Sequence, residues 1–310
     1  CSFIPKSGKH TDDLAKFYCS SRGKAEKGLE ISLLSLTDIS RNTAYTFSVQ
    51  QTPASAGDGE SRTDIYLEHL RRERPMLPAC IRYILTDGWF GKTRFIDGVT
   101  GLGLEQIGKL RHDADLRWLY TGEQKPRGRP RLYDGKVDFD DLNRFEPAGE
   151  ADGVKLYTAV VNSPCFKRNL RIVYLVKTVG DRVQTALLFS TDLEQSAEEI
   201  YRFYKARFQI EFLFRDAKQF TGLCDCQARR RDALHFHFNA AMTALNLLRL
   251  EDLEQADGDG RRVISIAGWK TRKANVHLLE RFSSFLGLDF SSIKSRPGFE
   301  SLCNHGAIAE

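Results

Sequence analysis

Hydrophobic and polar positions in the first quarter of the chain follow both strand-like and helix-like patterns. Residues 29–39 and 44–51 are rich in β-forming side chains, and the polar residues 40–42 between them predict a hairpin. Residues 64–74 place apolar side chains among charged ones, which predicts a short helix that ends before Pro75. This part of the chain is therefore expected to combine strands and helices.

A compact apolar run at residues 81–86 predicts a buried strand. The run ends at Asp87-Gly88, a dipeptide typical of turns, and residues 92–101 are predicted to form the next helix. Short β-like segments then alternate with turns rich in Gly, Pro and Asp. These segments are residues 104–110, 116–120 and 154–161.

The second half of the chain opens with a predicted hairpin and continues as helices. Residues 170–179 and 182–189 form its strands, with Gly180-Asp181 as the turn. The sequence Thr191-Asp192-Leu193-Glu194 then fits a capping box, and the periodic apolar face that follows predicts one long helix over residues 197–220. The remaining predicted elements are a helix over residues 233–250, a flexible stretch at 257–262 and a helix near residues 273–286.

Composition narrows the class of protein only a little. With 310 residues and 41% hydrophobic content, the chain can bury a sizeable core. Its net charge of +5 is too mild to indicate a nucleic-acid partner by itself. Seven irregularly spaced cysteines do not form a secreted disulfide framework, so reduced thiols are expected. The apolar runs are too short to span a bilayer, the chain opens with no signal peptide, and it carries neither a Walker-type nor a dinucleotide-binding motif.

Two carboxylates occupy positions from which a metal could be held. Asp87 lies where a buried strand ends, and Glu211 lies in the middle of the predicted long helix. Carboxylates so placed can converge on Mg²⁺, which prefers oxygen ligands and keeps positions open for phosphate oxygens. Each residue also has an ordinary interpretation, because Asp-Gly is most often a turn and a helical Glu is most often solvated.

The surroundings of Glu211 favour a site for a charged ligand. The predicted helix reads Tyr204-x2-Arg207-x3-Glu211-x6-Lys218. Spacings of 3, 4 and 7 residues place these four side chains on one helical face. A phenol, two cations and an acid in one row suit phosphates and a metal better than they suit an isolated surface pair.

These residues carry a resemblance to a known family. The Tyr204–Arg207–Glu211–Lys218 spacing is similar to the Y-R-E-K signature of bacterial insertion-sequence transposases of the DDE type. Asp87-Gly88-Trp89-Phe90 resembles the segment that holds the second family carboxylate. Further similar stretches are residues 2–9, 51–53, 110–114 and 128–130, so the resemblance covers most of the chain.

The resemblance implies an α/β, RNase H-like fold with a mixed β-sheet flanked by helices. Residues 1–103 and 166–250 would form a discontinuous catalytic core. Residues 104–165 would be a β-rich insertion before the last catalytic helix, and residues 251–310 a C-terminal helical tail.

It also implies DNA cleavage at transposon ends followed by strand transfer into target DNA. Asp87 and Glu211 would be catalytic metal ligands in a two-metal site for Mg²⁺ or Mn²⁺. Tyr204, Arg207 and Lys218 would contact phosphates of double-stranded DNA near the cut. The partners would be transposon ends and target DNA, with a homodimer in the synaptic complex, and the location would be the bacterial cytoplasm, at the nucleoid, with no membrane.

The sequence departs from the family pattern at one position. The first family Asp would directly precede Cys1, so this chain is expected to lack it and to have little or no nicking activity. Asp12 and Asp13 lie beyond the Gly8 turn and do not replace it. One alternative is a catalytically decayed or domesticated transposase that only binds DNA. Another is a different RNase H-like nuclease such as a junction resolvase, against which the Y-R-E-K pattern argues.

A basic segment inside the predicted insertion is a second candidate for DNA contact. Pro126-Arg127-Gly128-Arg129-Pro130 has the core of an AT-hook, which lies in the narrow minor groove of A·T-rich DNA. We prefer the simpler interpretation of a basic loop on a folded subdomain that touches phosphates. In either case the candidates are Lys125, Arg127, Arg129 and Arg131.

A zinc site is not favoured by the cysteine and histidine spacing. Cys224-x-Cys226 and His235-x-His237 do not fit the usual zinc-ligand spacings, and residues two apart on a helix point to different faces.

Overall fold

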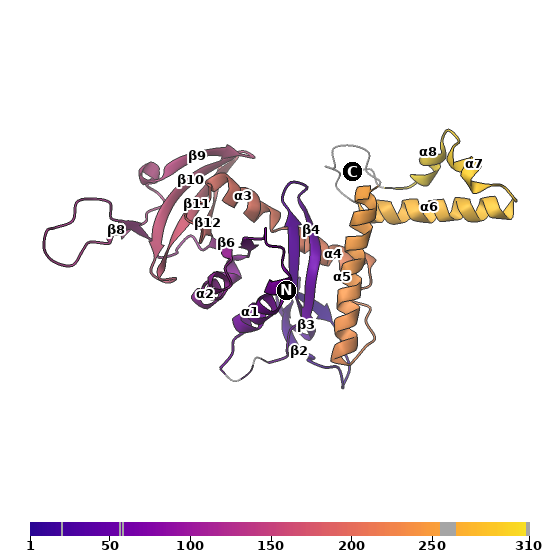
Figure 1. Cartoon of the computed structure of the whole chain (residues 1–310), viewed down its shortest axis with the longest axis horizontal. Coiled ribbons are helices and arrows are strands. Elements are labelled where there is room, and N and C mark those ends of the chain that lie inside the picture. Colours follow the sequence, from indigo (N-terminus) through magenta and orange to yellow (C-terminus); the bar gives the residue numbers. More distant parts are fainter. Residues whose placement is uncertain (20, 56, 58, 255–264, 308–310) are drawn as a thin grey trace. The chain divides into compact units, whose positions relative to one another are not determined.

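A computed structural model describes residues 1–19, 21–55, 57, 59–254 and 265–307. The chain divides into two compact units, drawn in Figure 1. Unit 1 consists of Cys1–Gln51 and Glu211–Glu310, and unit 2 consists of Thr52–Ile210. The stretch at 257–262, which we predicted to be flexible, lies outside the described residues.

Unit 1 contains a four-stranded antiparallel sheet built around one long strand. That strand, β3, pairs with each of the other three, and its pairing with β4 confirms the predicted hairpin. Buried Leu29, Ile31 and Leu33 of β3 contribute to the core. The strands are β1 (Ser2–Pro5), β2 (Ala15–Cys19), β3 (Lys24–Asp38) and β4 (Thr43–Gln51).

The helices of unit 1 come from the C-terminal part of the chain. They are α4 (Gln209–Phe220, whose first two residues belong to unit 2), α5 (Arg231–Glu254), α6 (Ile266–Phe285), α7 (Phe290–Lys294) and α8 (Phe299–Cys303). In Figure 1 the long helix α5 lies alongside β4, and the two elements are in contact.

Two asparagine side chains of α5 complete the hydrogen bonding of strand β4. The Asn246 amide accepts from Thr46 N at 2.8 Å and donates to Thr46 O at 2.7 Å. The Asn239 amide does the same for Val49, at 3.2 Å and 2.9 Å. Because an unpaired strand edge invites association with another strand, α5 protects this edge of the sheet.

Unit 2 is built on an eight-stranded mixed sheet. Its order is β5-β6-β12-β11-β10-β7-β8, and β9 also pairs with β10. Strands β5 and β6 are parallel and the remaining pairs are antiparallel. The strands are β5 (Tyr83–Leu85), β6 (Glu105–Leu110), β7 (Arg117–Leu119), β8 (Tyr133–Lys136), β9 (Glu146–Ala151), β10 (Val154–Ser163), β11 (Arg168–Val179) and β12 (Arg182–Ser190). The helices are α1 (Arg62–Glu73), α2 (Thr93–Gly101) and α3 (Ala197–Ala206), and short 3-10 turns are η1 (Arg74–Met76), η2 (Gly88–Phe90) and η3 (Leu142–Arg144).

Helices cover both faces of this sheet. Successive side chains of a strand point to opposite faces, and on β12 Leu187 and Phe189 enter one apolar cluster while Leu188 enters another. The first cluster includes Ile96 of α2, and the second includes Ile200 of α3. A large mixed sheet with helices on both faces confirms the α/β class predicted from the sequence.

The predicted helix over residues 197–220 is wrong in one respect, because it is two helices. Helix α3 ends at Ala206 and α4 begins at Gln209, with Arg207 and Phe208 in the turn between them. The apolar periodicity continues through this break, and no Gly or Pro marks it, so the pattern alone did not reveal it.

The predicted capping box at Thr191 is also wrong. Ser196 is the N-cap of α3, and its hydroxyl accepts from Glu199 N at 3.2 Å. Thr191 instead accepts from Gln106 N at 2.8 Å and donates to Glu105, so tertiary partners on β6 occupy its hydroxyl.

The segment proposed as an insertion, residues 104–165, is continuous with the large sheet. It supplies five of the strands, including β6, which pairs with β5. Among the described helices, none combines the length and the apolarity needed to cross a membrane.

Candidate active site

Asp87 lies immediately beyond strand β5. The backbone pairing of this edge strand extends one residue further, through Thr86 N to Ile107 O at 2.9 Å. Asp87 then serves as the N-cap of η2, and its Oδ1 accepts from Trp89 N at 2.8 Å. The residue is exposed, and none of the described residues donates a hydrogen bond to its second carboxylate oxygen. Strand β5 is thus a half-buried edge strand, not the buried strand that the apolar run predicted, and Asp87 is an exposed residue just beyond its end.

Gln106 forms hydrogen bonds on both sides of this turn. Its side chain is fully buried on β6, and its amide donates to Thr86 Oγ1 at 2.8 Å and to Phe90 O at 3.3 Å. These two acceptors flank the Asp87 turn on either side. Gln106 therefore holds both ends of the turn in place, a role that the sequence analysis missed.

Aromatic side chains pack around the same turn. The Trp89 ring meets Tyr66 and Phe90 edge-on, at centroid distances of 5.6 Å and 4.9 Å. Trp89 remains 44% exposed, and the Lys92 ammonium lies 3.4 Å from the centroid of its ring. The turn that carries Asp87 therefore has an exposed indole and a cation beside it.

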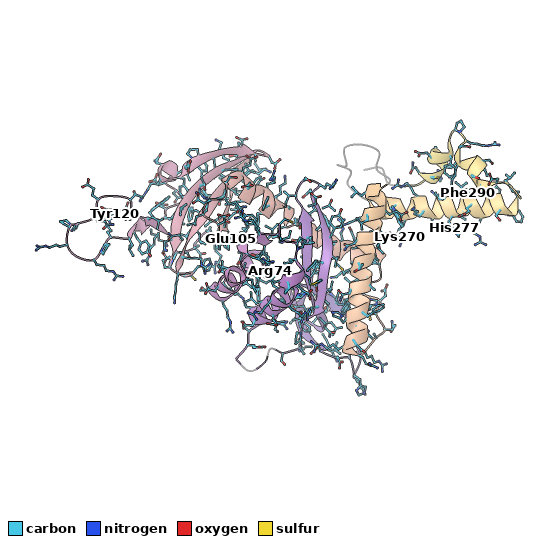
Figure 2. All side chains as sticks on the ribbon, viewed as in Figure 1. Arg74, Glu105, Tyr120, Lys270, His277 and Phe290 are labelled. Carbon is cyan, nitrogen blue, oxygen red and sulfur yellow. The ribbon has the colours of Figure 1, made fainter. Side chains whose placement is uncertain are left out.

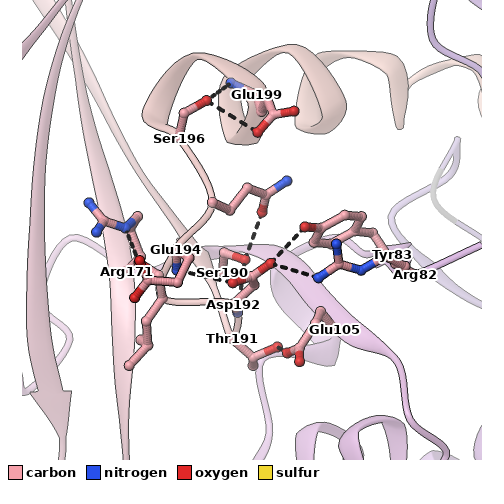
Figure 3. Close-up of polar contacts among 12 residues, drawn as sticks. Arg82, Tyr83, Glu105, Arg171, Ser190, Thr191, Asp192, Glu194, Ser196 and Glu199 are labelled. Atoms are coloured by element: carbon pink, nitrogen blue, oxygen red, sulfur yellow. Dashed lines mark hydrogen bonds and ion pairs between the residues drawn. The ribbon is translucent and has the colours of Figure 1, made fainter.

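A polar network connects β5 to the segment that precedes α3 (Figure 3). Asp192 accepts from Tyr83 Oη at 2.7 Å and from Arg82 Nη2 at 3.4 Å. Burial, reinforced by the hydrogen bond to Asp192, raises the pKa of Tyr83 to about 12. The Tyr83 ring also packs edge-on against Phe203 of α3, at 5.5 Å. Strand β5 and helix α3 are thereby fixed to each other within unit 2.

Tyr204 and Arg207 lie at the end of α3, where the structure brings them together. Arg207 is the C-cap residue, and its N–H bonds to Phe203 O and Tyr204 O. Its guanidinium lies 5.6 Å from the centroid of the Tyr204 ring. These two side chains form one cationic and aromatic group at the helix end.

Glu211 and Lys218 lie on α4 and are both exposed. They are seven residues apart, so they share one face of that helix. Lys218 Nζ donates to Phe3 O of β1 at 3.0 Å. This contact joins the lysine to the N-terminal segment that resembles the stretch after the first family carboxylate.

A buried ion pair anchors the opposite face of α4. Asp216 and Arg249 are each 7% exposed in their side chains, and Arg249 Nη2 lies 3.6 Å from Asp216 Oδ2. Arg249 Nη1 also donates to Ala44 O of β4. Burial lowers the pKa of the Arg249 guanidinium, and the Asp216 charge opposes that shift. The pair fixes α4 to α5 and β4, and nothing in the sequence pattern singled it out.

The four predicted basic residues lie in the connection between β7 and β8. Lys125, Arg127 and Arg129 are exposed. Arg131 is exposed as well, but it is paired, with Nη2 2.5 Å from Asp134 Oδ1.

Three other residues considered in the sequence, Asp12, His235 and His237, have ordinary structural roles. Asp12 Oδ2 accepts from Arg231 N, the first residue of α5, at 2.9 Å. His237 Nε2 lies 3.1 Å from Gly222 O, and His235 Nε2 lies 3.3 Å from the Asn239 amide. All of these residues belong to unit 1.

The two predicted metal ligands are each described within their own unit. Asp87 and Glu211 offer exposed carboxylate oxygens, the ligands that Mg²⁺ prefers. Asp87 belongs to unit 2 and Glu211 to unit 1. Over the described residues, no group of three or more His, Cys, Asp or Glu side chains is arranged to hold a metal ion.

Comparison with known proteins gives one family. A family model described as "Transposase DDE domain" matches residues 6–247, which is most of the chain and includes both carboxylates. A search of curated proteins found no significant match. The match and the mixed sheet agree with the RNase H-like class predicted from the sequence.

Proposed function

Because this chain belongs to the transposase DDE domain family, we propose that it cuts DNA at transposon ends and joins the freed ends to target DNA. In this reaction water attacks a phosphodiester and releases a 3′-OH, which then attacks a phosphodiester of the target. Each step exchanges one phosphorus–oxygen bond for another and needs no nucleotide cofactor. The family match over residues 6–247 is the observation that carries the proposal.

Asp87 and Glu211 are proposed to hold the divalent metal, Mg²⁺ or Mn²⁺, in a two-metal site. A bound metal pair would supply charge stabilisation for the attacking and leaving oxygens. The exposed oxygen of Asp87 and the exposed carboxylate of Glu211 support this assignment. The hydrogen bonds from Gln106 to Thr86 and Phe90 restrain the turn on both sides of Asp87, which supports its role as a ligand.

Tyr204, Arg207 and Lys218 are proposed to contact DNA phosphates close to the cut. Arg207 presents a planar guanidinium that can bond two phosphate oxygens at once, and Lys218 supplies a point charge. The Arg207 guanidinium lies 5.6 Å from the centroid of the Tyr204 ring, which supports the two acting together. With Glu211, these residues match the spacing of the insertion-sequence Y-R-E-K signature, and we propose that the chain is of that type.

Several wider features belong to the same proposal. We propose that residues 1–103 and 166–250 form the catalytic core, that 104–165 are an insertion whose strands join the same sheet, and that 251–310 form the tail. The substrate is double-stranded DNA, and the synaptic complex contains two copies of the chain. The protein acts in the bacterial cytoplasm on DNA of the nucleoid.

The test is metal-dependent nicking of a labelled transposon-end duplex by the full-length protein. We expect Glu211→Gln to abolish nicking while a gel shift shows DNA binding largely unchanged, because the amide keeps the shape but loses the charge that holds the metal. Glu280→Gln, at an exposed position on α6, is the matched control and should nick normally.

Preserved nicking in Glu211→Gln would refute the metal assignment. DNA binding without any nicking by the unsubstituted protein would instead favour the decayed, DNA-binding alternative.

A further inference from the structure

The connection between β7 and β8 is a long exposed loop. Every residue from 121 to 132 is exposed, and Figure 1 shows the loop extending away from the sheet of unit 2. Two reasons favoured phosphate contact: a single hook binds weakly, and these residues were expected on a folded subdomain. The structure removes the second reason, because the loop is exposed along its whole length.

The base of this loop is nevertheless held firmly. The Gln124 side-chain amide donates to Arg131 O at 2.8 Å and accepts from Arg131 N at 2.9 Å, which closes the loop across seven positions. The Arg131 guanidinium lies 4.6 Å from the centroid of the Tyr120 ring, which Figure 2 shows beside the loop. Tyr120 Oη also donates to Glu123 O at 2.9 Å. A loop with fixed ends loses less conformational freedom when it binds a partner.

The cations of the loop divide into two kinds. Arg131 is paired with Asp134 and helps to hold the two ends of the loop together. Lys125, Arg127 and Arg129 have no acidic or hydrogen-bonding partner among the described residues, and they point into solvent. Three unpaired cations within five residues form a strip of positive charge that the fold itself does not use.

The backbone of the strip is thin at its centre. Gly128 has φ +104°, a conformation that residues with a side chain rarely adopt, and apart from its chain neighbours no described atom lies within 4 Å of where its Cβ would be. Pro126 and Pro130 on either side restrict the chain and remove two N–H donors. The result is an Arg-Gly-Arg strip in which nothing but backbone separates two guanidinium groups.

We propose that Arg127-Gly128-Arg129 binds in the minor groove of A·T-rich duplex DNA, with Lys125 on an adjacent phosphate. This rests on the proposed function only in taking DNA as the partner. The minor groove is about 6 Å wide and is narrower and more negative over A·T tracts, where inserted arginines are favoured. A glycine between the two arginines lets the backbone approach the floor of the groove.

A protein partner fits this loop less well. Protein interfaces depend on clustered aromatic or apolar anchors, and Leu132, which is 55% exposed at the end of the loop, is its one such side chain besides proline. Uniform phosphate contact would not need the glycine or the planar guanidinium groups. Binding in the minor groove accounts for all three features of the strip: the positive charge, the glycine without a side chain and the planar guanidinium groups.

The experiment compares binding of the full-length protein to an A·T-tract duplex and to a G·C duplex of equal length, at one fixed salt concentration. We expect a preference for the A·T duplex of about tenfold, the scale of one good base-specific contact. Arg127→Ala/Arg129→Ala should remove the preference. Arg127→Lys/Arg129→Lys, which keeps the charge, should also remove it while retaining most of the G·C affinity, because Lys lacks the planar guanidinium.

Lys177→Ala/Arg182→Ala is the matched control, since it removes two exposed charges from the β11–β12 hairpin of the same unit and should keep the preference. The proposal is overturned if the Lys variant keeps the A·T preference, if the Ala variant weakens both duplexes equally, or if polyglutamate competes as well as A·T DNA. Nicking is measured in parallel. An A·T preference without nicking would contradict the proposed function alone, and nicking without the preference would contradict this inference alone.

Discussion

The buried pair of Asp216 and Arg249 makes a quantitative prediction about helix α4. Asp216 has two arginine partners of opposite character. Arg249 is buried, while Arg215, whose Nη2 lies 3.0 Å from Asp216 Oδ1, is 62% exposed. Because burial decides how much a charge pair contributes to stability, replacing one arginine or the other should change the free energy of unfolding by very different amounts.

Arg249→Met should destabilise unit 1 by about 3–5 kcal/mol, because it leaves a buried carboxylate without its buried counter-ion. It also deprives Ala44 O of the donor that reaches it from α5. Arg215→Ala should cost at most about 1 kcal/mol, since an exposed pair is screened by water. The double variant Asp216→Leu/Arg249→Met should recover most of the loss, because it also removes the buried carboxylate, which would otherwise keep only the exposed Arg215 as a partner.

Hydrogen exchange followed by mass spectrometry measures this effect locally. In Arg249→Met, amides of α4, α5 and β4 should exchange roughly 10² to 10⁴ times faster, which is the predicted free energy expressed as a ratio. Amides of β11 and β12 belong to unit 2 and serve as the internal control. Equal effects of Arg249→Met and Arg215→Ala, or a double variant as unstable as Arg249→Met, would refute the reasoning.

Two further predictions concern the strand that leads to Asp87. Gln106→Leu should speed hydrogen exchange at residues 87–91 and lower nicking, because it removes the hydrogen bonds that hold the turn. It should change the free energy of unfolding by less than about 1 kcal/mol, because it also removes a buried side-chain oxygen that has no hydrogen-bond partner. Equal destabilisation throughout unit 2 would contradict this. An ultraviolet titration should find one phenol that ionises near pH 12 and is lost in Tyr83→Phe. Because the pKa of Tyr83 is raised in the folded protein, its contribution to the free energy of unfolding should be present below about pH 10 and lost between pH 10 and 12. If the unsubstituted protein and Tyr83→Phe lose stability equally over that range, the prediction is wrong.

Local patterns predicted the strands and hairpins well because turn chemistry fixes them. Gly180, in a left-handed conformation at φ +59°, joins β11 to β12 where the turn was predicted. The apolar run ending at Asp87 gave both the position of β5 and the place of the carboxylate. These features depend on residues that are close together in the sequence, so they can be predicted from it.

Features that depend on distant partners could not be predicted in this way. Thr191 and Ser196 both begin a plausible cap, and only the contact of Thr191 with β6 decides between them. The pairing of Asn239 and Asn246 with β4 joins residues about 200 positions apart. The same is true of Asp216 with Arg249, whose partners become evident only when α4, α5 and β4 are placed together.

The geometry of Asp87 shows that its ordinary and its functional interpretations are compatible. A carboxylate has two oxygens, and the turn uses only Oδ1, which accepts from Trp89 N. That bond restrains the side chain of an exposed residue, and none of the described residues donates a hydrogen bond to the other oxygen. An Asp at a turn is thus better prepared to bind a metal than a freely rotating one, because its orientation is set before binding. The Asp-Gly turn therefore supports the assignment of Asp87 as a ligand.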